Sequence, residues 1–265
     1  MTSEERRLEL ERRRMKALLD PLAAGVDAAG FRSGDPAGIV GEFSASRNSM
    51  SQADVEIAAL LVAMISWGNR KAIRATARKL VFEEMESRPE RYIRNGLFEN
   101  GGRGAFGKCV YRTLDFPHFQ AVCRNLGSAL RGKSTLEGAL SGKSAVDALR
   151  ELCSILAPAK VGFPGSSPCK RMCMFMRWMT RPGAPDFGLW KTRSQADLLA
   201  VMDVHVNRQT QAMRRCKTPS WKGCLELTGI FKAWDPCDPL KYDIALMMLA
   251  DGQRPAAPAR PQNAS

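Results

Sequence analysis

The chain has 265 residues, 45% of them hydrophobic, with 40 Lys and Arg against 27 Asp and Glu, which gives a formal charge of +13. This length supports a substantial core, and we expect one compact helical unit over residues 1–250, or two packed lobes with a cleft between them. The charge favours a polyanionic partner such as DNA, RNA or an anionic membrane surface, although a basic protein without a specific partner is an alternative. The longest uncharged apolar run, Ile57 to Gly68, is too short to cross a membrane.

The first third of the chain predicts two helices separated by a loop. Residues 3–24 form a charged helix with a leucine-rich side, and residues 25–50 are rich in Gly, Ser and Pro and are expected to be a loop. Ser51 then has the features of an N-cap, with an acidic residue at the third position of the helix. This helix is apolar on most sides through Ile65, so we expect it to be the central buried element.

The remaining segments also predict helices. Helices are expected over 71–95, 111–130, from Ser134, from Ser144, from 218 to about 233, and from 238 to about 249, with a flexible glycine-rich loop over 95–107. No segment alternates apolar and polar residues for long, so a sheet is not expected. Residues 251–265 have the composition of a disordered tail. The predicted fold class is therefore all-α.

The cysteines and histidines do not predict a metal site. Eight Cys and two His are present, and no pair of cysteines has the Cys-x-x-Cys spacing. In a chain of this size without a secretory signal, most cysteines are small core residues. We therefore expect no cofactor and no metal, and a cytoplasmic location because the charged N-terminus lacks an apolar signal segment.

The stretch from Gly165 to Arg208 contains the strongest candidate site residues. A helix beginning at Lys170 places Lys170, Arg177 and Arg181 on one stripe, with Arg171 and Trp178 beside it. No acidic residue lies between 165 and 185, so the stripe lacks a local partner. Unpaired cations next to a tryptophan are typical of a nucleic-acid contact, although an ordinary amphipathic helix with a solvated basic face is the alternative.

A second helix in this stretch begins after Asp203. Its side chain suits an N-cap, because it can accept hydrogen bonds from the backbone of the first turn. A carboxylate held at a helix start can also activate a nucleophile or stabilise a developing sugar cation. A cap alone and a catalytic carboxylate both fit the sequence.

Several strings in the chain resemble known families. CKRMCMFMRWMTR, PDFGLW, MDVHV and DPLKYDIAL resemble an uncharacterised bacterial domain-of-unknown-function family over nearly the whole chain. VMDVHVNR is also similar to a stretch of the helix–hairpin–helix DNA glycosylase superfamily, and GSSPCK resembles the divergent hairpin of archaeal-type 8-oxoguanine DNA glycosylases. Val204 replaces the usual Thr or Ser, and the usual LPGVG hairpin is absent.

The glycosylase likeness implies a function and a set of site residues. It implies base-excision repair by a DNA glycosylase/AP lyase, with Lys170 as the imine-forming nucleophile and Asp203 as the catalytic carboxylate. Removing an oxidised purine such as 8-oxoguanine requires taking the base out of the stack. The candidate residues for binding nucleic acid or base are Arg171, Arg177, Trp178, Arg181, Asp186, Trp190, His205, Arg208, Trp67, Asn69 and Asp243.

Two other functions fit the same sequence. A helical nucleic-acid-binding protein without activity needs the basic surface but not Lys170 and Asp203 in reach of each other. An enzyme acting on RNA is the third alternative. DNA is favoured over RNA as the partner, and a monomer is expected.

Overall fold

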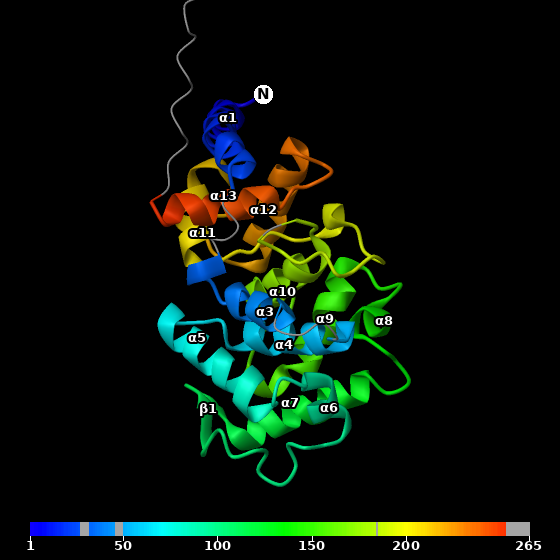
Figure 1. The fold of residues 1–265 in the computed structure, drawn as a ribbon. Coiled ribbons are helices and arrows are strands. Elements are labelled where there is room, and N and C mark those ends of the chain that lie inside the picture. Colours follow the sequence, from blue (N-terminus) through cyan, green and yellow to red (C-terminus); the bar gives the residue numbers. More distant parts are fainter. Residues whose placement is uncertain (27–31, 46–49, 184, 253–265) are drawn as a thin grey trace, which may run out of the picture.

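The computed structural model describes residues 1–26, 32–45, 50–183 and 185–252. This part of the chain is mostly helical, which confirms the all-α prediction (Figure 1). It also contains one short antiparallel pair, β1 (Cys109–Tyr111) and β2 (Leu114–Asp115), which the sequence did not predict. The pair is too short to produce sustained alternation. The expected tail over 251–265 lies outside the described residues from 253 onward.

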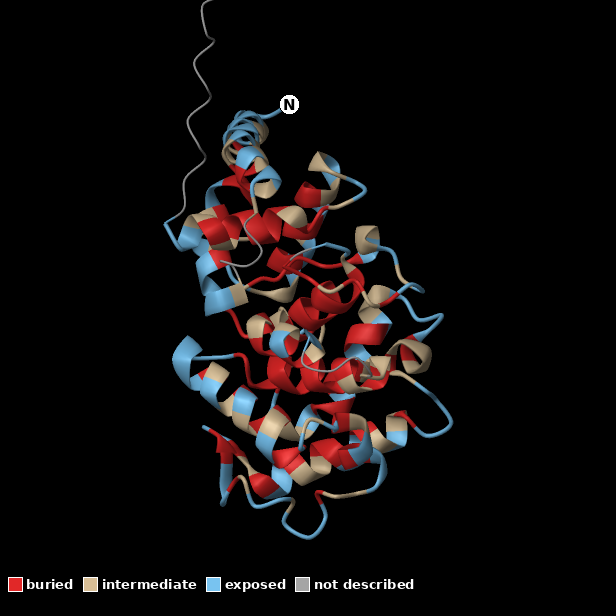
Figure 2. Ribbon diagram, in the orientation of Figure 1, coloured by how far each residue is buried: buried red, intermediate tan, exposed pale blue. Residues whose placement is uncertain are grey.

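Helix α4 (Gln52–Ile65) lies at the centre of the molecule, as predicted. All its residues except Gln52 and Asp54 are buried, and Ser51 accepts the backbone N–H of Asp54 as the expected N-cap. Helix α10 (Lys170–Thr180) packs against α4, and buried residues run through both helices (Figure 2). A helix that is apolar on all sides has no solvent-facing stripe, and this explains its central position.

One buried carboxylate fixes the surroundings of α4. Glu56 is 0% exposed and accepts hydrogen bonds from Gln52, from the backbone of Leu136 and Glu137, and from the indole N–H of Trp190. These donors come from three segments of the chain. Glu56 therefore joins α4 to the start of α8 (Leu136–Leu140) and to the loop that follows α10. Because its carboxylate oxygens are hydrogen-bonded, burying them costs little free energy.

The two ends of the described chain pack together. Helix α1 (Ser3–Ala24) contacts α13 (Lys241–Ala250), and Tyr242 donates a hydrogen bond of 2.9 Å to Asp20. The predicted first helix is confirmed, with Pro21 inside its last turn. Its leucine-rich side is buried, which explains why a strongly charged segment still packs against the body of the protein.

The prediction of a loop throughout 25–50 is wrong. Helix α3 (Ala37–Ala45) lies within it and packs on α4. Gly38 and Gly41 lower the helix propensity of this segment, whereas Ile39, Val40 and Phe43 are each no more than 1% exposed. Burial of these three side chains on α4 offsets the weak local preference.

The other elements follow the predicted order with shifted boundaries. Helix α8 is capped by Thr135 rather than Ser134, and α13 has Leu240 at its N-cap, so Asp238 does not cap it. No described helix is both long and apolar enough to cross a membrane. The remaining bounds are α5 (Arg70–Arg78), η1 (Lys79–Glu84), α6 (Pro89–Arg94), α7 (Phe116–Ala129), α8 (Leu136–Leu140), α9 (Ala145–Ile155), η2 (Ala157–Ala159), η3 (Gln195–Asp197), α11 (Val204–Thr210), η4 (Gln211–Met213) and α12 (Trp221–Trp234).

Candidate functional site

Lys170 and Asp203 meet in the folded chain. Lys170 Nζ lies 2.7 Å from Asp203 Oδ2, and the two side chains are 39% and 20% exposed. Each residue stands at the start of a helix, Lys170 as the first residue of α10 and Asp203 as the N-cap of α11. An amine and a carboxylate at this separation can exchange a proton and still be reached from solvent.

The Lys170 backbone is held by the turn before α10. Cys169 has a left-handed conformation with φ of 52°, which reverses the chain just before the helix. Arg171 donates to the carbonyl oxygen of Met64 at 2.5 Å and to that of Lys160 at 2.9 Å. Arg171 was predicted to contact nucleic acid, but its guanidinium instead fixes the start of α10 against the end of α4.

The Asp203 carboxylate is fixed through its other oxygen. Oδ1 accepts the backbone N–H groups of His205 and Val206, both at 2.8 Å, which leaves Oδ2 facing Lys170. Burial opposes ionisation, but the Lys170 charge and these hydrogen bonds together hold the pKa of Asp203 below its ordinary value. The residue is therefore both a helix cap and an oriented carboxylate, so the two interpretations of the sequence are compatible.

A cavity of about 280 Å³ opens beside this pair. Its lining comes from the end of α4, the start of α5, α10, α11 and α13, and from the Asp35–Pro36 turn. On α10 the lining residues are Lys170, Met174 and Arg177, which occupy one helix face at i, i+4 and i+7. The exposed fraction falls along this row, from 39% for the Lys170 side chain to 1% for Arg177, so Lys170 lies nearest solvent and Arg177 deepest.

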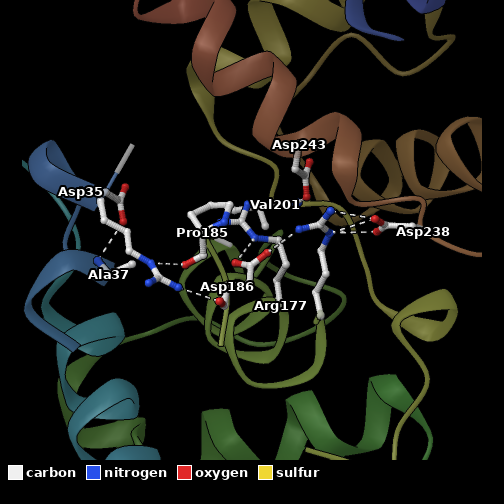
Figure 3. Close-up of polar contacts among 10 residues, drawn as sticks. Asp35, Ala37, Arg177, Pro185, Asp186, Val201, Asp238 and Asp243 are labelled. Carbon is white, nitrogen blue, oxygen red and sulfur yellow. Dashed lines mark hydrogen bonds and ion pairs between the residues drawn. The ribbon is translucent and has the colours of Figure 1, made fainter. Parts of the chain in front are cut away.

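The prediction of an unpaired basic stripe is wrong. Arg177 Nε lies 3.1 Å from Asp186 Oδ1, and Arg181 pairs with Asp186 at 3.3 Å and with Asp238 at 2.7 Å (Figure 3). The acids follow α10 in the chain, so the absence of acids between 165 and 185 did not reveal them. The Arg181 pKa is raised: burial opposes the charge, but the two carboxylates outweigh that effect.

Two tryptophans predicted to bind nucleic acid or base, Trp178 and Trp190, are core residues. Trp178 is 0% exposed and Trp190 is 3% exposed, with the Trp190 indole donating to Glu56. Neither ring faces the solvent or lines the cavity. Only Lys170, Met174 and Arg177 of α10 line the cavity, whereas the Trp178 ring packs in the core, so it cannot stack on an extruded base without rearrangement.

Four other predicted site residues are exposed and lie on or next to the segments that line the cavity. Trp67 is 36% exposed and lines the cavity, and the Arg112 guanidinium lies 4.4 Å from its ring centre. His205 also lines the cavity and is exposed, whereas Arg208 is exposed but not part of the lining. Asn69 accepts the N–H of Ala72 and caps α5.

Two buried acids of the cavity wall complete the site. Asp243 is 1% exposed, accepts the N–H of Val201 at 3.0 Å, and has its pKa raised by burial to about 7. Asp35 is 7% exposed, accepts the N–H of Ala37, and burial also raises its pKa. Asp243 was predicted as a site residue. Asp35 was missed.

Comparison with known proteins places the chain in a family. The model of the family described as "Protein of unknown function (DUF2400)" matches residues 43–251. The chain belongs to this family. No curated protein and no solved structure matches it. The matched region contains Lys170, Asp203, Arg177 and Asp243 and ends at residue 251, where the predicted tail begins. Among the described residues, no group of three or more His, Cys, Asp or Glu side chains is arranged to hold a metal ion.

Proposed function

We propose that this DUF2400 protein is a DNA glycosylase/AP lyase that removes an oxidised purine such as 8-oxoguanine. The observation that carries the proposal is the 2.7 Å contact between Lys170 Nζ and Asp203 Oδ2 at a cavity of about 280 Å³. That volume is near the lower end of the roughly 300–1,000 Å³ typical of small-molecule sites, which suits a single base. The formal charge of +13 supports binding to a polyanion.

The chemistry assigns one task to each residue of the pair. Lys170 must be neutral to attack, and Asp203 Oδ2 is placed to accept its proton. The lysine lone pair then forms a bond to the sugar carbon C1′, and the glycosidic electrons leave on the base, which takes up a proton. Loss of the second amine proton and opening of the sugar ring give an imine. Removal of a C2′ proton expels the 3′ phosphate, and water releases Lys170 by hydrolysing the imine.

One route to a neutral lysine is no longer available. Neighbouring cations such as Arg177 and Arg181 can disfavour a lysine ammonium by repulsion. Both arginines are compensated by Asp186 and Asp238, so their net effect on Lys170 is small. Proton transfer to Asp203 when substrate enters is the remaining route, because substrate binding excludes water from the pair and favours its neutral form.

Borohydride trapping tests the proposal. The protein is mixed with a duplex containing 8-oxoguanine and with a duplex containing an abasic site, and sodium borohydride reduces any imine to a stable covalent adduct. We expect an adduct with both duplexes, and its loss in Lys170→Ala. Lys222→Ala, at an exposed position on α12 away from the cavity, is the control and retains the adduct.

The two main rivals give different results. Salt-sensitive DNA binding without an adduct on either duplex contradicts the lyase and favours a binding protein. An adduct that persists in Lys170→Ala contradicts the assignment of the nucleophile. Structured RNA processed in place of duplex DNA would identify an RNA-acting enzyme.

A further inference from the structure

The deepest part of the cavity wall holds two polar atoms without a partner. Arg177 Nη1 and Asp243 Oδ1 are buried, and neither forms a hydrogen bond within the described part of the chain. Both side chains line the cavity and each residue is 1% exposed. Buried polar atoms are nearly always paired in folded proteins. Trp178 Nε1, Thr180 Oγ1 and Gln195 Oε1 also lack a partner in the described chain, but only Arg177 and Asp243 belong to one cavity lining, where a ligand can supply a partner to the donor and to the acceptor.

The neighbouring contacts fix the direction of both groups. Arg177 Nε is bonded to Asp186 at 3.1 Å, so the guanidinium cannot rotate to satisfy Nη1 without losing a buried ion pair (Figure 3). Asp243 Oδ2 accepts the N–H of Val201 at 3.0 Å, so Oδ1 is the oxygen left open. Arg177 on α10 and Asp243 on α13 line the same cavity. The site is therefore preorganised, which lowers the cost of binding.

The open atoms define the complementary ligand edge. Arg177 Nη1 only donates, and the Asp243 carboxylate only accepts once it is ionised, which is its form above a pKa of about 7. The matching edge has a carbonyl oxygen beside a ring N–H, which is a lactam. Guanine, 8-oxoguanine, hypoxanthine and uracil have such an edge. Adenine and cytosine instead have an exocyclic amino group beside a ring nitrogen acceptor, and the amino group would face the arginine.

We propose that Arg177 and Asp243 select bases with a lactam edge and reject bases with the amino-imine edge of adenine and cytosine. This inference rests on the proposed function, since it takes the cavity to be the place where the extruded base lies. Lys170 and Arg177 stand two turns apart on one face of α10, about 10 Å along the axis. This spacing lets the sugar lie at Lys170 while the far edge of the base reaches Arg177.

Matched pairs of free bases test the selection without DNA and without turnover. Hypoxanthine differs from adenine, and 1-methyluracil from 1-methylcytosine, only at the edge in question, and the N1 methyl group removes the lactam that free cytosine has at N1 and C2. Saturation-transfer NMR with equimolar pairs, at pH 8 where Asp243 is ionised, compares their binding to the intact protein. We expect the lactam member to bind about tenfold or more tightly in each pair, because one bidentate contact discriminates by about 1–3 kcal/mol. 8-Oxoadenine has a lactam only on its five-membered ring, at N7 and C8. Its binding shows whether the site also accepts a lactam on that ring.

Asp243→Asn separates charge recognition from shape. The Val201 N–H must still be accepted, so the Asn oxygen takes the Oδ2 place and its amide nitrogen replaces the open acceptor with a donor. We expect the preference for hypoxanthine over adenine to disappear. Asp147→Asn, on exposed α9 outside the cavity, is the control and retains the preference. Circular dichroism checks that both variants are folded.

The outcomes separate this inference from the proposed function. Equal binding of hypoxanthine and adenine to the wild type, or a preference unchanged in Asp243→Asn, overturns the lactam selection whether or not a borohydride adduct forms. Lactam-selective binding without any adduct leaves the recognition site standing and removes the lyase. An adduct formed equally with duplexes containing hypoxanthine and adenine leaves the lyase and removes the selection.

Discussion

Lys170 Nζ contacts Asp203 Oδ2 at 2.7 Å, while Asp203 Oδ1 accepts two backbone N–H groups at the start of α11. The carboxylate is thus held by the helix at one oxygen and presents the other to the lysine. This arrangement couples a structural task with a chemical one in the same residue. Substituting Asp203 by alanine would remove both, whereas asparagine can keep the cap.

Asp203→Asn is expected to bind DNA as the wild type does and to lose most of its turnover. Asparagine is as good an N-cap as aspartate, so α11 should remain intact. Removal of a proton acceptor typically lowers rates by about 10²–10⁴-fold. Single-turnover excision, together with fluorescence anisotropy for binding, measures the two effects separately. A variant with normal excision would show that Asp203 is only a cap.

Local signals in the sequence predicted much of the fold. Ser51, Ser144 and Asp203 cap helices where expected, because a cap depends on residues within one turn. Helix α3 was missed because its stability comes from burial on α4, which is a tertiary effect. The β1–β2 pair was missed because two or three residues cannot show a period.

The site was predicted less completely, since its ion pairs join distant segments. The resemblance led to Lys170 and Asp203, but the local sequence could not show that Arg181 meets Asp238. Trp178 and Arg177 were assigned to a solvent-facing stripe by helical geometry alone. Helical geometry gives the angle between side chains and not which direction faces solvent, and here the apolar surroundings of α10 bury both.

Asp186→Asn is expected to destabilise the protein by about 3–5 kcal/mol, because it leaves the buried Arg177 without its counter-charge. The Asp186 side chain is 0% exposed and lies between Arg177 and Arg181. Urea unfolding measures the change. The comparison is with Asp147→Asn, where the exposed pair with Arg150 contributes only about 0–1 kcal/mol. Equal midpoints for the two variants would show that the buried network adds no stability.

Arg112→Ala is expected to weaken DNA binding. It should also lower the slope of log affinity against log salt concentration by about one unit, which corresponds to the loss of one phosphate contact. Arg112 is exposed on the turn between β1 and β2, and its guanidinium covers the exposed Trp67 ring at the cavity. Affinity is measured by anisotropy over a series of salt concentrations. Arg150→Ala, at an exposed position of α9 outside the cavity, is the matched loss of one charge. The same slope in both variants would argue against a DNA contact at this turn.

The buried Asp243 carboxyl makes the stability of the fold depend on pH. Burial raises the pKa of Asp243 from 3.8 to about 7, with the Arg177 charge and the Val201 N–H opposing the shift. Between these values the folded state holds a proton that the unfolded state has released, so the contribution of Asp243 to stability falls as pH rises toward 7. At pH 8 the buried carboxylate is ionised and its cost is fully present.

Asp243→Asn keeps the hydrogen bond to Val201 and removes this titration. We therefore expect the variant to match the wild type near pH 4 and to exceed it at pH 8, by about 4 kcal/mol at most if the whole shift is expressed, since each pKa unit corresponds to about 1.4 kcal/mol. Urea unfolding of both proteins from pH 4 to pH 8 isolates the effect, because all other groups titrate alike. A difference that is constant with pH would mean that Asp243 is not protonated in the folded protein, and a variant less stable at pH 8 would mean that the Asp243 charge stabilises the fold through Arg177.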